Sequence, residues 1–465
     1  MRISFENTAA VRKPRSLIFL SLVAALLSLS ACSMNPSNQD YPKQISEETA
    51  TVSPWQNSNN AVPVSNLNDL IAASGVMPLI DTALNNNPSL QQTLLTLQIL
   101  EKQLTITEAA QLPVVGAGFG ATRSSDSDDV FNSNVSVSWQ ADLWGQLDDL
   151  EQAAQQDLIQ QSLLLQSARD TLAAEVIKNW LTLIAQQRAT DIEKQRLQSL
   201  KQTEGFILDR YQQGLGILED LDSARTAVAS SEARLTALQE NQRQQQILFR
   251  TLLGQTALPS LANLPEDYPA VLLPIADLPE QTLERRPDLR AAFVAINAAD
   301  LRSEAAYKDL LPRLDFQAIL QDVARSPRAA LFGGPAWSLL GQLTAPLYEG
   351  GQRKATAEIS ELQTAIAYQD YRDQLLTAVT EIEQALSFEQ ALQSQQQSVE
   401  KALASAENNL KQYQTSYQNG LKTILELLSV QQQNFDLQAQ RDDLIYQRLL
   451  NRINLGLALG MEINA

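Results

Sequence analysis

The tetrapeptide Tyr211-Gln-Gln-Gly214 recurs 206 residues later as Tyr417-Gln-Asn-Gly420. A repeat period this long exceeds the roughly 20 to 50 residues of solenoid and propeller repeats, so each copy must be a large supersecondary unit. The chain is therefore predicted to contain two copies of one such unit. Two more pairs keep the same spacing without a gap: Leu253-Gly254 with Leu459-Gly460, and Gly145-Gln146 with Gly351-Gln352.

The first 31 residues have the layout of a signal peptide. Basic residues precede an apolar run from Leu17 to Leu29, which is too short for a comfortable membrane span. The run ends in Leu29-Ser-Ala-Cys32, which resembles a bacterial lipobox, where the cysteine is diacylated and becomes the N-terminus. We expect a covalent lipid on Cys32; the alternative is an ordinary signal peptide with a chance cysteine. Ser33, where aspartate would be associated with inner-membrane retention, favours the outer membrane.

The composition argues against catalysis and against nucleic-acid binding. The formal net charge is −18, whereas affinity for nucleic acid comes mostly from Lys and Arg. The chain has no histidine, the commonest general base and metal ligand, and its single cysteine has no partner for a disulfide. Acidic pairs such as Asp148-Asp149 are typical of solvated helix surfaces. We expect no enzyme, no metal site and no cofactor besides the lipid.

Each copy reads as a helix, two strands, a long helix, a glycine turn and another helix. The second copy starts where Arg286-Pro287 matches Asn87-Pro88 at a spacing of 199 residues. The long helical segments, 146–213 and 352–419, contain no proline and would each span about 100 Å. The predicted divisions are a signal peptide 1–31, a lipidated N-terminal arm 32–75, a first repeat 76–254, a Pro-rich equatorial linker 255–285, a second repeat 286–460 and a tail 461–465.

The segments 113–144 and 312–348 change from helical to alternating periodicity and predict two β-hairpins. Alternation runs from Val115 to Ala121 and from Val135 to Leu143 in the first hairpin, with the same pattern in the second as far as Leu347. A loop is expected near 326–335. Strands of about 10 to 14 residues can cross a bilayer when tilted. The alternative is a soluble hairpin with one buried face.

Four motifs stand out in the chain. They are the lipobox at Cys32, the phrase from Leu278 to Arg290 that contains Arg285-Arg286-Pro287-Asp288, the segment from Ala345 to Gly351, and the two Tyr-x-x-Gly turns. With these motifs the chain resembles, over residues 67–460, the TolC-like outer-membrane efflux proteins, specifically the lipidated NodT subgroup. The arm departs from the family pattern, because it keeps Pro54-Trp55 but lacks a clear second tryptophan and an Asp-Pro string.

The resemblance implies a homotrimer with a shared twelve-stranded outer-membrane β-barrel on a long periplasmic α-helical barrel. Strand counting agrees, because four strands cannot close a barrel, eight give a filled interior, and three chains are the fewest that leave an open bore. The fold expected is mainly α, with a transmembrane β-hairpin pair in an internally duplicated protomer. The implied function is passive export as the exit duct of a tripartite efflux or type I secretion system. Substrates would arrive from an inner-membrane transporter through a periplasmic adaptor protein.

The candidate sites lie at the two glycine turns. Gly214, Gly216 and Gly420 can take positive φ and reverse the chain at the periplasmic tip, beside Tyr211 and Tyr417. This tip is the surface that would meet the helical hairpin of an adaptor. The other interpretation makes the glycines turn formers only.

A carboxylate stands six residues past Gly214 and Gly420, as Asp220 in the first copy and Glu426 in the second. In a trimer these side chains would form an acidic ring near the entrance, and such rings favour cations. The alternative is that both are ordinary surface acids in the first turn of a helix, stabilised by the helix dipole.

Two other protein classes fit parts of the pattern. A lipidated periplasmic adaptor, also called a membrane fusion protein, would have one helical hairpin flanked by compact β domains. A structural coiled-coil lipoprotein would need no paired strands. The two helical hairpins and four span-length strands favour the duct over both.

Overall fold

A computed structural model describes residues 40–50, 75–125, 127–257, 264–270, 283 and 285–461. Over these residues the chain is mainly helical and contains four strands, which confirms the mainly α prediction. In the described ranges, no helix has both the length and the apolar character for crossing a membrane. Cys32 and the signal-peptide segment lie outside the described residues.

The chain divides into two compact units, each assembled from separate stretches. One unit includes residues 107–153 and 299–365 and holds the β-sheet. The other includes 42–106, 154–298 and 366–465 and holds the helical hairpins.

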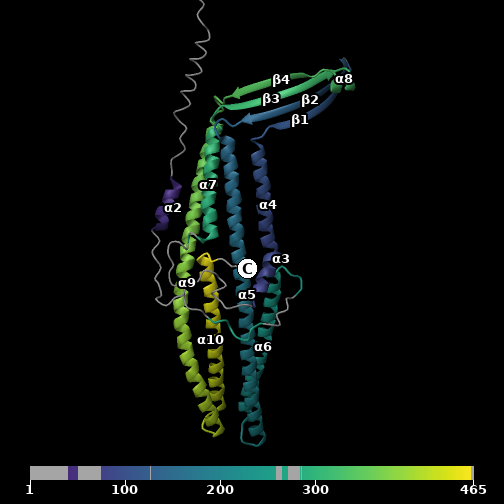
Figure 1. Cartoon of the computed structure of the whole chain (residues 1–465). Helices are drawn as coiled ribbons and strands as arrows, with labels where there is room; N and C mark the ends of the chain where they lie inside the picture. The colour runs from purple at the N-terminus through teal and green to yellow at the C-terminus, as the bar shows by residue number, and fades with distance from the viewer. Residues whose placement is uncertain are drawn as a thin grey trace, which may run out of the picture. The chain divides into compact units, whose positions relative to one another are not determined.

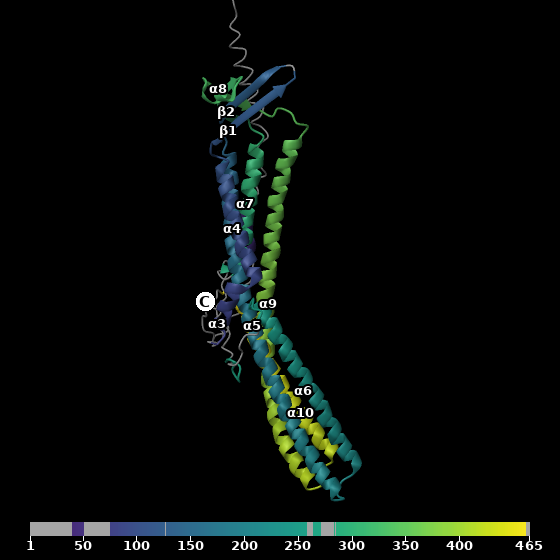
Figure 2. The same ribbon diagram turned by 90° about the vertical axis from the view of Figure 1, so that its right-hand side faces the viewer.

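The helices follow the duplication of the sequence. Each of the two longest, α5 and α9, has 67 residues and is about 100 Å long. In both views α6 runs back beside α5, and α10 beside α9 (Figures 1 and 2). The first repeat contains α3 (Met77–Asn86), α4 (Pro88–Ala109), α5 (Gln146–Gln212) and α6 (Leu218–Leu252), and the second contains α7 (Pro287–Lys308), α9 (Gln352–Gln418) and α10 (Ile424–Ala458).

The strands from both repeats form one antiparallel sheet in the order β1-β2-β3-β4. The two hairpins meet where β2 pairs with β3, in a register that sets Trp139 opposite Phe316. Both β1 and β4 are edge strands, paired on one side only. The bounds are β1 (Val114–Ser124), β2 (Ser127–Ala141), β3 (Arg313–Ala324) and β4 (Ala336–Thr344).

The register divides the sheet into an apolar face and a polar face, because directly paired residues point to the same side. The apolar face carries Val115, Ala117, Phe119, Ala121, Phe131, Val135, Val137, Trp139, Ala141, Leu314, Phe316, Ala318, Leu320, Ala324, Trp337, Leu339, Gly341 and Leu343, with Ser133 and Asp322 as its polar members. The polar face carries Thr122, Asn132, Asn134, Ser136, Ser138, Gln140, Arg313, Asp315, Gln317, Gln321, Ser338, Gln342 and Thr344, with Gly116, Gly118, Gly120 and the aliphatic residues Val114, Val130, Ile319, Val323, Ala336 and Leu340.

The second hairpin differs from its prediction in two places. The sequence predicts a loop over 326–335, but the structure contains a short helix there, α8 (Pro327–Phe332). Ser326 caps it by accepting a hydrogen bond from Ala329 N–H, and a proline occupies the first turn. The strand alternation expected as far as Leu347 stops at Thr344. Pro346 explains the early end, since proline has no N–H for a strand ladder.

Part of the N-terminal arm is helical. Within the lipidated arm predicted over 32–75, Tyr41–Ala50 forms α2. Glu48 forms an ion pair with Arg372 of α9 over 2.8 Å and accepts a hydrogen bond from the Tyr368 hydroxyl over 3.2 Å. Ile45 is buried on the same helix. A ten-residue helix has too few turns to show its periodicity in the sequence.

The short helices of each repeat abut at equivalent positions. Asn87, just before α4, donates from Nδ2 to the carbonyl of Leu252 at the end of α6 over 2.9 Å. Arg286, just before α7, donates from Nη1 to the carbonyl of Ala458 at the end of α10 over 3.0 Å. Gly254 lies at the first junction, where its φ is +67°. Both junctions therefore join a helix start to a helix end through a side chain on a backbone carbonyl.

Candidate functional site

Both helical hairpins turn on the same hydrogen-bond pattern. At the first turn, Gly214 N–H donates to the Tyr211 carbonyl over 3.0 Å, and Leu215 N–H donates to the Arg210 carbonyl over 2.9 Å. The second turn repeats both bonds at the same lengths around Gly420. The two glycines have φ of +75° and +73°, the left-handed conformation that ends a helix in a Schellman motif. The duplicated Tyr-x-x-Gly motif is thus a pair of helix C-caps.

Gly216 does not use the positive φ that its position suggested. A Cβ there would lie 3.3 Å from the backbone nitrogen of Tyr211. Glycine at this position lets the turn pass close to the end of α5. The second turn has Lys422 at the matching position, so this contact belongs to the first turn only.

The two turns pack on a shared core. Tyr417 is buried in it, and burial raises the pKa of its hydroxyl. The Phe206 ring meets the Tyr417 ring edge-on at 5.9 Å, and the Arg210 guanidinium lies 5.6 Å from its centre. Tyr211, its counterpart, is exposed. The repeats have therefore diverged here, and only Tyr211 is available to a partner. The buried members of the core are Ile207, Leu221, Ala224, Tyr417, Ile424 and Leu427.

Glu426 is held by local contacts at the start of α10. Its carboxylate accepts from Lys422 Nζ over 2.6 Å and from Thr423 N–H over 2.9 Å, and Thr423 completes a capping box. The Lys422 ammonium, with the Thr423 N–H and hydroxyl, lowers the pKa of Glu426 to about 2. Glu426 is therefore ionised throughout the physiological range, but its charge is partly balanced by Lys422.

Asp220 occupies the matching position in the first turn of α6, where Ile217 provides no side-chain cap. Among the described residues, no ion pair is found for Asp220. The two acids thus share a place in the repeat and differ in their neighbours. Exposed apolar side chains surround both turns: Leu215, Ile217, Leu218, Leu421 and Leu425.

In the part of the chain that the structure describes, no group of three or more His, Cys, Asp or Glu residues is arranged to hold a metal ion. Glu426 is engaged by a lysine and a helix cap rather than by other carboxylates.

The second helical hairpin contains a buried charge cluster that the sequence did not predict. Glu389 of α9 is buried and accepts hydrogen bonds from Arg448 Nη2 over 2.9 Å and from Arg452 Nε and Nη2 over 2.9 and 2.8 Å. Arg452 is only 1% exposed. Two arginines four residues apart on a predicted helix were the available signal, but the same spacing is common on exposed faces.

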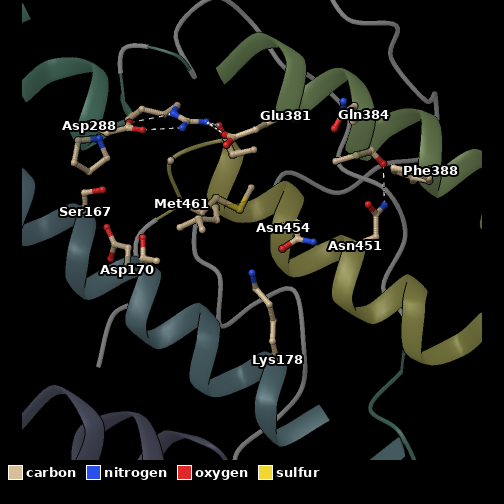
Figure 3. A pocket seen from close by; sticks show the side chains of 17 residues that line it. Ser167, Asp170, Lys178, Asp288, Glu381, Gln384, Phe388, Asn451, Asn454 and Met461 are labelled. Atoms are coloured by element: carbon tan, nitrogen blue, oxygen red, sulfur yellow. Dashed lines mark hydrogen bonds and ion pairs between the residues drawn. The ribbon is translucent and has the colours of Figure 1, made fainter. Parts of the chain in front are cut away.

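A cavity of about 500 Å³ lies where α7 begins and α10 ends. Arg286 lines it and pairs with Asp288 and Glu381, both over 2.7 Å. Dashed lines between these two labelled acids mark the contacts in Figure 3. Lys178 of α5 points toward the same space (Figure 3). The motif Arg285-Arg286-Pro287-Asp288, prominent in the sequence, thus acts at a junction, where Arg286 holds the start of α7 to α9 and α10.

Comparison with known proteins agrees with this architecture. The family model described as outer membrane efflux protein matches residues 79–255 and 278–461. Outer membrane protein OprJ of Pseudomonas aeruginosa is 27% identical over 408 residues, which are 84% of each chain. SilC of Salmonella typhimurium, a probable outer membrane lipoprotein, is 23% identical over 454 residues, which are 94% of this chain and 97% of SilC.

The fold also matches solved structures. The outer membrane protein VceC of Vibrio cholerae superimposes with a TM-score of 0.78 at 22% identity, over 87% of this chain and 100% of the VceC chain. The matched ranges of the family model take in both repeats, all four strands and both helical turns. The chain is therefore a member of the outer membrane efflux protein family and an outer-membrane protein.

Proposed function

We propose that three copies of this chain form the exit duct of a tripartite efflux or type I secretion system, through which substrates leave passively. The observation that carries this proposal is the division of the sheet into an apolar and a polar face. In outer-membrane barrels the outward face is apolar and the face toward a water-filled bore is polar. A soluble sheet with one buried face would have its apolar side covered, but Trp337 and Leu339 are 78% and 69% exposed.

The apolar face is nearly as tall as the apolar band of an outer-membrane barrel. Phe131 and Trp139 are eight residues apart on β2, which is about 27 Å along the strand and about 20 Å of membrane depth at the roughly 40° tilt of barrel strands. The apolar band of outer-membrane barrels is about 25 Å tall and bounded by aromatic residues. Aromatic pairs lie toward both ends here: Phe119 stacks on Phe131 at 6.4 Å, and Trp139 on Phe316 at 5.8 Å.

The free edges of the sheet support a trimer. In lipid, unpaired strand edges are costly, because no water is present to bind the exposed N–H and C=O groups. Pairing β4 of one copy with β1 of the next removes every edge once the ring closes. Three copies give twelve strands, the smallest multiple of four that leaves an open bore.

The helical turns are proposed as the periplasmic entrance and as the docking surface for an adaptor protein, which receives substrates from an inner-membrane transporter. The exposed apolar side chains at the turns, together with Tyr211, give an adaptor helix a surface to bury. Gly214, Gly216 and Gly420 contribute by shaping the turns, and the buried Tyr417 by packing beneath them.

A lipid on Cys32 is proposed as a second membrane attachment. The similarity to SilC, whose name describes a lipoprotein, supports this assignment. The Glu48–Arg372 ion pair fixes α2 on α9, which would limit the reach of the segment between the lipid and the protein. No enzymatic step and no other cofactor are part of the proposal.

The proposed activity is tested by reconstitution of the full chain in planar bilayers. We expect stepwise ion conductance and a trimer in mild detergent. An adaptor or a structural coiled-coil lipoprotein would not conduct. Absence of conductance from protein that is trimeric and inserted would overturn the proposal.

Neutralising the entrance acids is expected to reduce cation selectivity. In a potassium chloride gradient, the reversal potential should move toward zero for Asp220→Asn and further for the double variant with Glu426→Gln. Asp220→Asn should have the larger single effect, because the charge of Glu426 is already shared with Lys422. Lys422→Ala serves as the opposite control, since it frees Glu426 and should raise cation selectivity. Unchanged selectivity in the double variant would refute the acidic ring.

A further inference from the structure

The short helix α8 lies at the end of the sheet opposite to the strand ends that continue into the helices (Figure 1). Its burial is uneven. Ala330 is 1% exposed, whereas Leu331 and Phe332 are 54% and 81% exposed. Two large apolar side chains therefore project outward from a helix that is itself packed on the sheet.

The contacts of α8 place it on the apolar face. Ser133 and Asp322 are direct cross-strand partners and the polar members of that face. The Ser133 hydroxyl donates to the carbonyl of Ala330, and Gly334 N–H donates to Asp322 Oδ2 over 2.9 Å. The backbone of α8 and the turn after it thus satisfies both polar side chains.

The glycine after α8 permits this close packing. A Cβ on Gly333 would lie 2.7 Å from Asp322 Oδ2 and 2.4 Å from the carbonyl oxygen of Ala329. A larger residue would force the chain away from the sheet and expose the carboxylate. The sequence Phe332-Gly333-Gly334 therefore combines an outward aromatic ring with a backbone N–H that binds the half-buried Asp322.

The boundary between polar and apolar surroundings lies close to α8. Exposed ion pairs join Arg123 to Asp129 over 2.7 Å and Arg325 to Asp128 over 3.1 Å at this end of the sheet. The apolar rows of the sheet lie on the other side, toward Leu339. The helix therefore stands between a charged rim and the apolar face.

We propose that α8 is a lipid-contacting helix, and that Leu331 and Phe332 insert among the acyl chains of the outer membrane. This inference rests on the proposed function, which makes the apolar face the side toward lipid. A carboxylate and a hydroxyl facing hydrocarbon are costly, and α8 covers both. On a water-facing surface the Asp322 carboxylate and the Ser133 hydroxyl could bind water and would need no cover. The Phe332 ring would then expose apolar surface to water, which is unfavourable. Continuity with the exposed Trp337 and Leu339 identifies lipid as the occupant.

Spin labelling of single cysteines in the full chain, reconstituted in phospholipid vesicles, tests this contact. A label at Phe332→Cys should collide more often with oxygen, which concentrates in lipid, than with a water-soluble nickel complex. Leu339→Cys and Leu340→Cys are matched controls, because these neighbours point to the apolar and the polar face. The oxygen-to-nickel collision ratio should be several-fold higher at 332 and 339 than at 340. Labelled wild-type chain gives the background from Cys32.

The controls separate the two proposals. If 339 and 340 differ as expected but 332 is accessible to nickel, the lipid contact of α8 is wrong and the duct stands. If 339 and 340 do not differ, the proposed duct itself fails.

Should Phe332→Cys fold poorly, Leu331→Cys reports the same surface. Ser133→Ala, which removes the hydrogen bond to Ala330, should raise the mobility of the label at 332 and lower its oxygen preference.

Discussion

Glu389→Gln is expected to lower the stability of the second helical hairpin by about 3 to 5 kcal/mol, because it leaves buried arginine charge without a counter-charge. Arg452 is 1% exposed and has two of its nitrogens on this carboxylate. Native-state hydrogen exchange along α9 and α10 measures the local opening free energy. Glu383→Gln, an exposed acid on the same helix, is the control and should change stability by less than about 0.5 kcal/mol.

The first repeat has uncharged residues at the positions of the Glu389, Arg448 and Arg452 cluster, and these residues can be substituted into the second repeat. At the spacing of 206 residues, Leu183, Gln242 and Gln246 correspond to Glu389, Arg448 and Arg452. The triple variant Glu389→Leu, Arg448→Gln and Arg452→Gln should recover most of the stability lost in Glu389→Gln, because no buried charge is left unpaired. A triple variant no more stable than the single one would contradict this account.

The same cluster predicts an acid transition. Burial alone would raise the pKa of Glu389, but hydrogen bonds from Arg452 and Arg448 lower it below its usual range. A carboxylate with a lowered folded pKa contributes stability above its unfolded pKa of about 4.3, and loses it as pH falls through the folded pKa. Exchange protection of α9 and α10 should therefore weaken in this acid range in the wild type and not in the triple variant.

Gly254→Ala is expected to be the most damaging glycine substitution at the helix ends. Its φ is +67°, and an added Cβ would lie 2.2 Å from the carbonyl oxygen of Asn86. The left-handed conformation costs about 1 to 2 kcal/mol, and relieving the clash about 1 to 3 kcal/mol more. Thermal unfolding of the purified protein, followed by circular dichroism, measures the loss, and hydrogen exchange should locate it at the ends of α3 and α6.

Gly214→Ala is the matched control, because its φ is +75° and a Cβ there would meet nothing within 4 Å. The loss of stability in Gly214→Ala should therefore contain only the cost of the left-handed conformation, without a clash. Gly460→Ala, with a Cβ 3.0 Å from the nitrogen of Arg286, should fall between the two. If Gly214→Ala destabilises as much as Gly254→Ala, the close approach at the helix junction is not what makes glycine necessary.

The sequence predicted those features that repeat or alternate over many residues. The 206-residue spacing located both helix C-caps, because a left-handed residue selects glycine at the same place in each copy. The alternation of Val115 to Ala121 with small residues identified one face of the sheet before its register was known. Both signals come from local backbone geometry, which a single sequence records directly.

Features that depend on contacts between distant segments were not predictable. Glu389 meets Arg452 only because α9 and α10 pack together, and its sequence neighbours resemble those of an exposed acid. Gly216 was expected to share the conformation of Gly214, but its role is set by distance to Tyr211 rather than by its own φ. The helices α2 and α8 are too short for a periodic signal, and each is stabilised by partners more than 100 residues away.

The open edges of the sheet have a genetic consequence in the proposed trimer. A barrel closed by β1-to-β4 pairing cannot form if any one of its three chains cannot pair. A chain with a defective β4 would therefore inactivate every trimer that it joins, even when the other two chains are normal. With equal amounts of normal and defective chain mixing at random, about one eighth of the trimers would contain only normal chains. Alleles that damage an edge strand should therefore be dominant, and those that prevent synthesis recessive.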